Sequence, residues 1–346
     1  MKQFGALPLR SAAFAGVILF AASAAPAFAQ DRYAAIVIDA ETREVLHQDA
    51  ADEQRFPASL TKMMTLYMLF EAMERGEVSL EDRIVASRHA ARQPPSRLGV
   101  RRGDSLSVEQ AIGALVVQSA NDVAVMVGER LGGTEANFAE QMTARARQLG
   151  MANTRFMNAS GLPNPHIRTT ARDMATLSLA LWRDFPQYYH YFQTPSNAWR
   201  GREGRNHNHL LGQVEGVDGI KTGYTRASGY NLASAAVRNG RRVIAVVLGG
   251  ETSAARDAQV AYLIESAYEE LARRQQLDPA GITYASREVQ TVNATLARNG
   301  QTILPGGPRA NGPVGPLRGP LEPVPFAPVE QGDAADGDAG DGEAAR

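Results

Sequence analysis

Ser59 and Lys62 are the first residues of this 346-residue chain whose types and spacing could carry out chemistry. They stand three apart in an apolar stretch from Pro57 to Phe70, so on a helix their side chains would share one face. A serine hydroxyl is a weak nucleophile until a neighbour removes its proton. Lys62 can do this only if its pKa falls well below about 10.4, as burial or a second cation would cause. On its own, the pair does not distinguish a nucleophile from a helix start that carries a solvated lysine.

Two further groups of residues change the meaning of that pair. Ser119-Ala120-Asn121 stands at an expected helix break, and Lys221-Thr222-Gly223 lies on a strand-like run. Of the 36 basic residues only Lys2, Lys62 and Lys221 are lysines. A general bias toward arginine explains the bulk, but a buried lysine can lose its proton and serve as a base, whereas arginine keeps its charge. Both lysines that follow the N-terminal leader fall within these groups, which favours a chemical role for each.

Hydrophobic periodicity and turn residues predict helices and antiparallel strands. The stretch that begins near Ser59 is apolar almost all round and ends at Gly76, so we expect a buried helix there. The turn Asn239-Gly240 predicts a hairpin between two strand-like runs. The other expected elements are a hairpin over residues 34–47, helices over 107–118, 121–132, 134–149, 170–182 and 253–274, a loop over 158–165, and strands over 219–224, 231–237 and 243–248.

Composition separates a globular part from two terminal segments. Lys2 and Arg10 precede a short apolar run that ends in Ala27-Phe28-Ala29, the order of a secretory signal cleaved after Ala29. Eight of the 18 prolines lie beyond residue 300, in a stretch with too little apolar surface to order itself. We therefore expect a signal peptide over residues 1–29, a catalytic domain over 30–275 and a low-complexity, disordered tail over 276–346.

Several other classes of function are disfavoured. The formal net charge is -1, without a long basic run, so we expect no nucleic-acid partner. The chain has no cysteine, which excludes disulfides and thiol catalysis. His207-Asn208-His209 could share a metal on a strand, but no third ligand cluster is visible, so a surface loop is the better interpretation. No Gly-x-Ser-x-Gly elbow occurs, which disfavours a Ser-His-Asp hydrolase. We expect no cofactor and no metal.

The ordered triple resembles the three motifs of penicillin-binding proteins and serine β-lactamases. Over residues 31–275 the chain is similar to the serine D-alanyl-D-alanine carboxypeptidases, which are low-molecular-mass penicillin-binding proteins. Three stretches carry this resemblance: residues 57–65, residues 149–162 and residues 217–225. It implies an α+β fold of the penicillin-binding-protein/serine β-lactamase type, with an antiparallel β-sheet flanked by helices plus an all-helical lobe that holds the middle motif. The nucleophile would lie between the sheet and that lobe.

The same resemblance implies removal of the terminal D-alanine from peptidoglycan stem peptides that end in D-Ala-D-Ala. Ser59 would form an acyl-enzyme, and Lys62 would be the base that activates it. Ser119 would relay a proton to the departing amine, and Asn121 would hold the peptide amide of the stem. The oxyanion would lie between the backbone N–H groups of Ser59 and Tyr224, each such donor being worth on the order of 10²–10³ in rate.

The remaining implied residues bind the substrate. Lys221 and Thr222 would bind the terminal carboxylate, and Arg256 matches a family arginine that helps them, although a surface arginine fits the sequence nearly as well. Gly223 would leave room for an extended peptide beside the strand, and Tyr224 would contribute its backbone N–H. β-Lactams would act as covalent inhibitors. The expected location is the periplasm, after export across the inner membrane.

The chain differs from many of these relatives in two respects, and three other functions are alternatives to this interpretation. Ala120 replaces a glycine found in many relatives, and too few residues follow Arg274 for the second β-domain and amphipathic helix of those relatives, so membrane attachment does not carry over.

A class A β-lactamase needs a glutamate between the second and third motifs, and none occurs over residues 141–202. A silent wall-binding protein would have lost a catalytic group, but all are present. A DD-endopeptidase that cuts cross-links uses the same residues and stays open.

Overall fold

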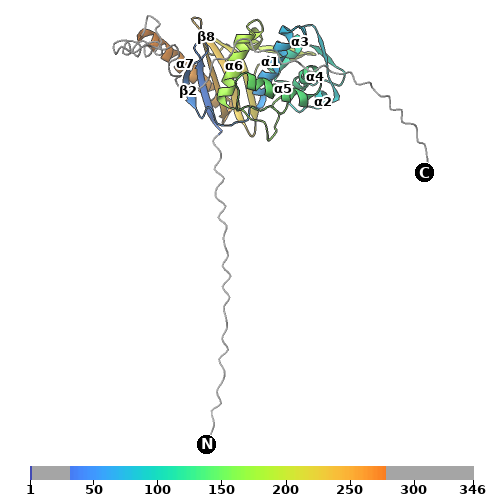
Figure 1. The fold of residues 1–346 in the computed structure, drawn as a ribbon, viewed down its shortest axis with the longest axis horizontal. Helices are drawn as coiled ribbons and strands as arrows, with labels where there is room; N and C mark the ends of the chain where they lie inside the picture. Colours follow the sequence, from blue (N-terminus) through green and yellow to red (C-terminus); the bar gives the residue numbers. More distant parts are fainter. Residues whose placement is uncertain (2–31, 278–346) are drawn as a thin grey trace, which may run out of the picture. The chain divides into compact units, whose positions relative to one another are not determined.

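A five-stranded antiparallel sheet is the frame of the chain in this computed structural model, which describes Met1 and residues 32–277 (Figure 1). The expected signal peptide, and the expected tail from residue 278 onward, lie outside the described residues. The sheet runs in the order β2-β1-β9-β8-β7, so the N-terminal hairpin pairs with the last strand along the chain. Its strands are β1 (Ala34–Asp39), β2 (Val45–Asp49), β7 (Val217–Thr225), β8 (Gly229–Arg238) and β9 (Arg241–Gly250).

Seven α-helices and several short elements complete the described part of the chain. Over residues 32–277, no helix combines the length and the apolar character needed to cross a membrane. The helices are α1 (Thr61–Glu74), α2 (Arg88–Ala91), α3 (Val108–Gly113), α4 (Asn121–Gly132), α5 (Glu135–Gln148), α6 (Ala171–Asp184) and α7 (Ser253–Leu277). The short elements are the 3₁₀ turns η1 (Ala58–Leu60) and η3 (Tyr189–Gln193), the π-helical turn η2 (Ala114–Gln118), and the two-stranded ribbons β3 (Arg83–Val85) with β4 (Ser105–Ser107) and β5 (Ser196–Trp199) with β6 (Arg202–Arg205).

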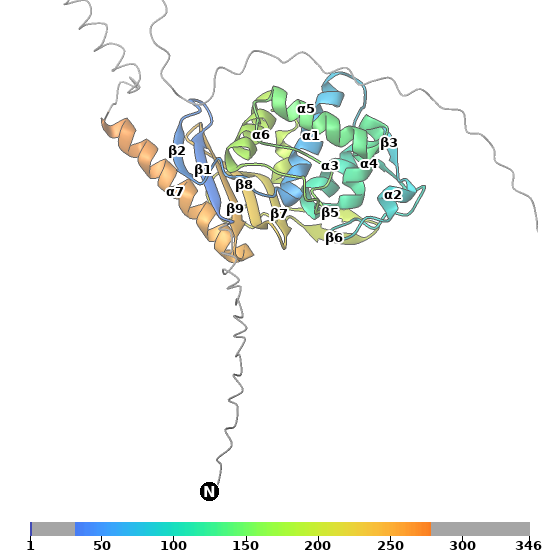
Figure 2. The same ribbon diagram turned by 60° about the horizontal axis from the view of Figure 1, so that its bottom comes forward.

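Both faces of the sheet are covered by helices. This is necessary because every residue of β1 is buried and successive residues belong to two different cores. Ala34 and Ile36 belong to one hydrophobic core, whereas Ala35 and Val37 belong to another. Successive strand residues point to opposite faces, so a strand that is apolar at every position needs two layers over it. Helix α7 packs on one face and α6 on the other (Figure 2).

The larger core extends from the sheet into a helical lobe through α1. This helix has little amphipathic character, because its residues from Thr61 to Phe70 are all buried. A helix that is apolar all round must be enclosed on every side. Helix α1 packs against α4, α5 and α6, and η1, just before it, packs against β7 (Figure 2). The residue at the start of α1 therefore lies where the sheet meets the helical lobe.

The expected α+β class, with an antiparallel sheet flanked by helices, is confirmed. The long helices and both hairpins also lie where the sequence predicts them. Two boundaries differ. The helix expected to begin near Ser59 is preceded by a 3₁₀ turn, in which Ala58 has a φ of 49°. The last helix ends at Leu277 instead of near residue 274.

Candidate active site

Ser59 and Lys62 lie in contact at the junction of the sheet and the helical lobe. Lys62 Nζ is 3.1 Å from Ser59 Oγ, and the Lys62 side chain is fully buried. Ser59 belongs to η1 and Lys62 to the first turn of α1. Ser59 is only partly buried and lines a cleft, so its hydroxyl can reach a ligand while the amine behind it is shielded from water.

The other two partners of Lys62 Nζ are neutral oxygens. Nζ donates to Asn121 Oδ1 at 2.8 Å and to the Ser160 carbonyl oxygen at 2.7 Å. Burial lowers the pKa of Lys62 well below its ordinary value, and the charge of Lys221 lowers it further. The carboxylate of Asp122 opposes this shift, but its oxygens already accept backbone N–H groups from residues 98–100. These surroundings favour the neutral amine.

Lys221 provides the second cation that the sequence analysis expects near Lys62. It lies on β7, the edge strand that faces η1, and is almost fully buried. Its Nζ donates to the Thr222 carbonyl oxygen at 3.2 Å. Burial lowers the pKa of Lys221 to about 7, and the charge of Arg256 contributes to this shift. A group balanced between its charged and neutral forms near neutral pH is typical of a functional site.

Ser119 occupies a sharp break between the π-helical turn η2 and helix α4. It has φ 55° and ψ 40°, the left-handed region that serine rarely adopts. Within the described part of the chain its buried Oγ has no hydrogen-bond partner. A strained backbone and an unpaired buried hydroxyl are both costly, and both cluster at functional sites. Ser119 lines the same cleft as Ser59.

Asn121 starts α4 and has both ends of its side-chain amide engaged. Oδ1 accepts from Lys62, and Nδ2 donates to the Pro94 carbonyl oxygen at 3.0 Å. The family resemblance implies that Asn121 holds the peptide of the substrate. In the structure its side-chain oxygen contacts Lys62, and Asn121 also lines the cleft.

One cleft of about 410 Å³ brings most of the expected residues together. That volume suits a small ligand or part of a peptide. Lys62 and Lys221 do not line this cleft. Of the residues singled out from the sequence, those that line it are Ser59, Ser119, Asn121, Thr222, Gly223, Tyr224 and Arg256.

Gly223 shows how closely β7 approaches the nucleophile. A Cβ at this position would stand 2.9 Å from Ser59 N and 3.1 Å from the Pro57 carbonyl oxygen. Any side chain here would press on the turn that carries Ser59. The glycine expected to make room for a peptide thus also makes room for the backbone of the nucleophile.

Arg256, at the start of α7, is buried and not a surface arginine. Its guanidinium donates to the Asn231 carbonyl oxygen at 2.9 Å, to Ser253 Oγ at 2.9 Å and to Asp257 Oδ1 at 2.7 Å. Asp257 also contacts His209 Nδ1 at 3.0 Å. The guanidinium is therefore held in one position, and Arg256 lines the cleft together with Thr222.

His207 and His209 line the cleft but do not lie on a strand, because they belong to the turns that follow β6. Burial lowers the pKa of His207 to about 4, and nearby cations, first among them Lys221, contribute. Over residues 32–277 no group of three metal-ligating side chains occurs. The sequence contained no signal that would place His207 beside the motif lysine, since a turn of this kind is fixed by tertiary contacts.

Comparisons with known proteins agree with this geometry. A family model described as D-alanyl-D-alanine carboxypeptidase, peptidase family S11, matches residues 21–252. The D-alanyl-D-alanine carboxypeptidase DacF of Bacillus subtilis is 31% identical over 245 residues, which is 69% of this chain and 63% of that protein. DacA of Escherichia coli, named as the same kind of enzyme, is 35% identical over 231 residues, 65% of this chain and 57% of that protein. The chain thus spans about three fifths of the length of these curated relatives.

Solved structures of penicillin-binding proteins share the fold. Penicillin binding protein 5 of Haemophilus influenzae is 30% identical, with a TM-score of 0.66, over 68% of this chain and 70% of that one. Penicillin-binding protein D2 of Listeria monocytogenes, in its ampicillin-bound form, is 33% identical with a TM-score of 0.60, over 68% of this chain and 96% of that one. With the family model matched over most of its described residues, the chain belongs to the D-alanyl-D-alanine carboxypeptidase family of serine peptidases, peptidase family S11.

Proposed function

We propose that this protein is a serine-type D-alanyl-D-alanine carboxypeptidase that removes the terminal D-alanine from peptidoglycan stem peptides through an acyl-enzyme on Ser59. It works in the periplasm, where those peptides are exposed. The observation that carries the proposal is the contact between Ser59 Oγ and the Lys62 amine, which is buried and has only neutral oxygens as its other partners. The names of the relatives support the same activity.

The hydrogen-bond partners of Lys62 explain how the amine acts as a base. A neutral amine has two N–H groups and one lone pair. Asn121 Oδ1 and the Ser160 carbonyl oxygen can only accept here, so they take both N–H groups. The lone pair is then directed at Ser59 Oγ, 3.1 Å away, and accepts the hydroxyl proton. An ammonium would direct a third N–H at Ser59 and could not accept that proton.

The reaction proceeds in two balanced steps. Ser59 Oγ attacks the carbonyl carbon of the penultimate D-alanine while its proton passes to Lys62 Nζ. The C–N bond to the terminal D-alanine breaks, and the departing nitrogen receives the proton from Lys62 by way of the Ser119 hydroxyl, which has no other partner among the described residues. In the second step water attacks the carbonyl carbon of the ester and gives a proton to Lys62, the bond from that carbon to Ser59 Oγ breaks, and Oγ takes the proton from Lys62 as the shortened peptide is released. The backbone N–H groups of Ser59 and Tyr224 stabilise the oxyanion in both steps.

The far end of the cleft binds the terminal carboxylate. Thr222 and Arg256 line the cleft, and Lys221, buried behind it on β7, is close enough to Arg256 for their charges to interact. Strand β7 is an edge strand, so an extended peptide can pair with it on the side that faces Ser59. β-Lactams, which carry a carboxylate beside a reactive amide, acylate Ser59 in the same way and act as inhibitors.

The direct test is release of D-alanine from a peptide that ends in D-Ala-D-Ala, together with mass-spectrometric mapping of a labelled penicillin. We expect D-alanine release by the wild type and a penicillin adduct on the peptide that contains Ser59, with both lost in Ser59→Ala. Purified protein that neither binds penicillin nor releases D-alanine would refute the proposal. A cross-linked muropeptide dimer as a second substrate separates the carboxypeptidase from the endopeptidase, since only the latter yields monomers.

A further inference from the structure

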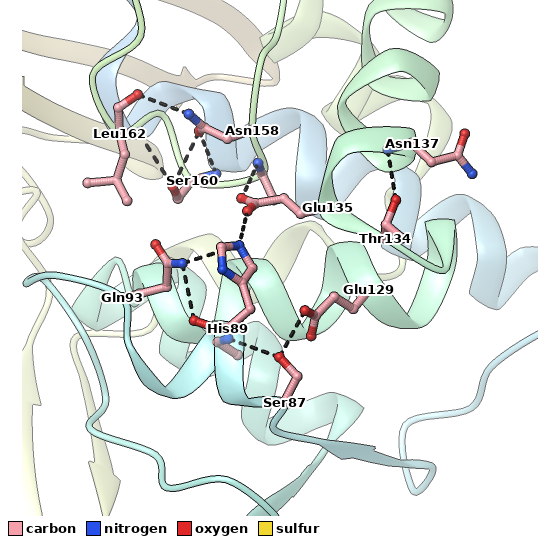
Figure 3. Close-up of polar contacts among 12 residues, drawn as sticks. Ser87, His89, Gln93, Glu129, Thr134, Glu135, Asn137, Asn158, Ser160 and Leu162 are labelled. Atoms are coloured by element: carbon pink, nitrogen blue, oxygen red, sulfur yellow. Dashed lines mark hydrogen bonds and ion pairs between the residues drawn. The ribbon is translucent and has the colours of Figure 1, made fainter. Parts of the chain in front are cut away.

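We propose that Glu135 and His89, which lie outside the cleft, are positioning residues that set the direction of the Lys62 lone pair. This inference rests on the proposed function, because it concerns the base of that reaction. Neither residue lines the cleft. A hydrogen bond of 2.7 Å between His89 Nε2 and Glu135 Oε2 (Figure 3) joins the two segments that hold the two acceptors of Lys62.

The first segment is the loop that follows α5 and carries Ser160. Glu135, the first residue of α5, accepts the backbone N–H of Ala159 on Oε1 at 3.1 Å (Figure 3). The Ala159 carbonyl oxygen accepts from Thr65 Oγ1 at 2.6 Å, and the next carbonyl oxygen, that of Ser160, accepts from Lys62. The contact with Glu135 and the contact with Lys62 are thus made by two consecutive residues, Ala159 and Ser160. The position of Glu135 therefore sets the position of the Ser160 carbonyl group.

Hydrogen bonds within this loop fix its shape, so a displacement of Ala159 also displaces Ser160. Asn158 Oδ1 accepts the backbone N–H groups of Ser160 and Gly161, at 3.2 and 2.7 Å, and Asn158 Nδ2 donates to the Leu162 carbonyl oxygen (Figure 3). These bonds hold the loop in one shape but tie it only to itself. Within the part of the chain that the structure describes, residues 158–162 bond to the rest of the molecule through Ala159 and Ser160 alone, with Glu135, Thr65 and Lys62 as partners.

The second segment leads from His89 to Asn121. His89 lies on the short helix α2, and the chain continues from it through Gln93 to Pro94 and Ser96. The Pro94 carbonyl oxygen accepts Asn121 Nδ2 at 3.0 Å, and the Ser96 carbonyl oxygen accepts the Asn121 backbone N–H at 2.7 Å. This segment therefore orients the amide whose oxygen is the other acceptor of Lys62.

The contact between His89 and Glu135 thus links the segment that orients Asn121 to the loop that carries Ser160. Since the two acceptors direct the lone pair of Lys62 at Ser59, relative motion of the two segments would misdirect that lone pair. The pair is poorly placed for a large contribution to stability, because the His89 side chain is 56% exposed and exposed ion pairs contribute little. A role in positioning and a role in stability therefore predict different measurements.

The test compares Glu135→Ala, Glu135→Gln and His89→Gln with Glu265→Gln as the matched control. Glu265 lies on the outer helix α7 and forms an ion pair with Arg238, the last residue of β8. Both residues are remote from Lys62. For each full-length variant, stopped-flow reaction with a fluorescent penicillin gives the dissociation constant of the first complex and the acylation rate constant separately. Melting temperature and circular dichroism report the fold.

We expect Glu135→Ala and His89→Gln to lower the acylation rate constant about tenfold, less than the roughly 100-fold cost of a 1 Å misplacement in an active site. The dissociation constant of penicillin should change less than the acylation rate constant, since neither Glu135 nor His89 lines the cleft. Glu135→Gln keeps an oxygen for the Ala159 N–H, so its rate should lie between those of the wild type and Glu135→Ala. The control should acylate like the wild type.

Wild-type acylation rate constants in Glu135→Gln and His89→Gln would overturn the inference, and so would a loss shared equally by the Glu265→Gln control. If Glu135→Ala does not fold, the two glutamine variants decide the question. A wild-type protein that fails to react with penicillin would refute the proposed function instead, so the two failures are distinguishable.

Discussion

The position of each lysine amine, more than its presence, gives this site its chemistry. Lys62 has two neutral acceptors and one serine hydroxyl as its partners, whereas Lys221 has a single backbone acceptor, the Thr222 carbonyl oxygen. An arginine in either place would keep its charge at every accessible pH. That difference explains why lysine occurs at these two positions in a chain whose only other lysine is Lys2.

The pH dependence of kcat/KM should separate the two lysines. Lys62 must be neutral to act as a base, so activity falls on the acid side as its lowered pKa is crossed. Lys221 must be charged to bind a carboxylate, and its pKa is lowered to about 7, so kcat/KM for a D-Ala-D-Ala peptide should fall as the pH rises through about 7. In Lys221→Arg the charge persists, and the alkaline fall should disappear even if the maximum is lower.

This prediction is checked by measuring kcat/KM from about pH 5 to about pH 10, because that ratio reports the pKa values of the free enzyme. An alkaline limb at the same pH in the wild type and in Lys221→Arg would show that another group titrates there. The maximum value of kcat/KM does not test the prediction. The pH at which kcat/KM falls on the alkaline side does.

At the scale of elements, several residues of the site lie at irregular helical turns and at the start of a helix. The 3₁₀ turn η1 presents Ser59, the π-helical turn η2 ends at Ser119 in the left-handed region, and α4 begins at Asn121. Irregular helical turns of this kind recur at functional sites. Gly161, in the loop that holds Lys62, has a φ of 80°, and a Cβ there would collide with the Ala58 carbonyl oxygen.

Gly161→Ala should therefore move the loop and η1 apart, destabilise the protein by more than about 2 kcal/mol and lower penicillin acylation. Gly201→Ala is the matched control, because Gly201 has a nearly equal φ of 77° but open space where the Cβ would lie. The control should lose only about 1 kcal/mol, from backbone strain alone. Chemical denaturation and acylation rates test this, and equal losses in both variants would contradict it.

The sequence predicts the long elements well and the short ones poorly. Periodicity over fourteen residues marks α5 and α6, and Asn239-Gly240 marks the β8–β9 hairpin, so these are confirmed. The four-residue helix α2 and the β5–β6 ribbon were not predicted, because elements this short carry no periodicity and form through tertiary contacts. His89 and Glu135 were missed for the same reason, since no local pattern joins residues of two different segments.

At the scale of the whole molecule, the site lies where the sheet and the helical lobe meet. The motif residues come from η1, α1, α4, β7 and α7, and the order β2-β1-β9-β8-β7 leaves β7 at the edge beside η1. The three motifs could be recognised from the sequence, but their convergence depends on this strand order, which no local pattern encodes. The catalytic-domain limits of 30 and 275 stay a prediction.

The burial of several basic side chains where the sheet meets the helical lobe lowers the free energy of unfolding. Lys62, Lys221 and Arg256 are all buried; the charge of Lys221 lowers the pKa of Lys62, and the charge of Arg256 lowers the pKa of Lys221. Among the described residues, the hydrogen bond that Lys221 Nζ donates is the one to the Thr222 carbonyl oxygen, at 3.2 Å, and it offsets little of the cost of desolvation. Since its pKa is lower in the folded chain than in the unfolded chain, the unfolded chain binds more protons between about pH 7 and 10.4. The contribution of Lys221 to stability is therefore most unfavourable below about pH 7 and vanishes above about pH 10.

Lys221→Met should consequently raise the free energy of unfolding, by about 2 kcal/mol near pH 6, while abolishing the binding of carboxylate substrates. The gain should shrink as the pH rises toward 10. Urea denaturation at several pH values measures it. A methionine variant that is less stable than the wild type at all pH values would show that the lysine stabilises the fold.

The central claim is that a neutral amine at position 62 removes the proton of Ser59, and the Lys62→Arg variant tests it most directly. Arginine keeps the positive charge and the donors but cannot serve as a base. The measurement is the rate constant for covalent attachment of labelled penicillin to Ser59, with near-UV circular dichroism to establish that the variant is folded. We predict that a folded Lys62→Arg variant loses nearly all acylation, by at least about 100-fold, the low end of the contribution of a general base. Acylation of Ser59 at close to the wild-type rate in that variant would contradict the account.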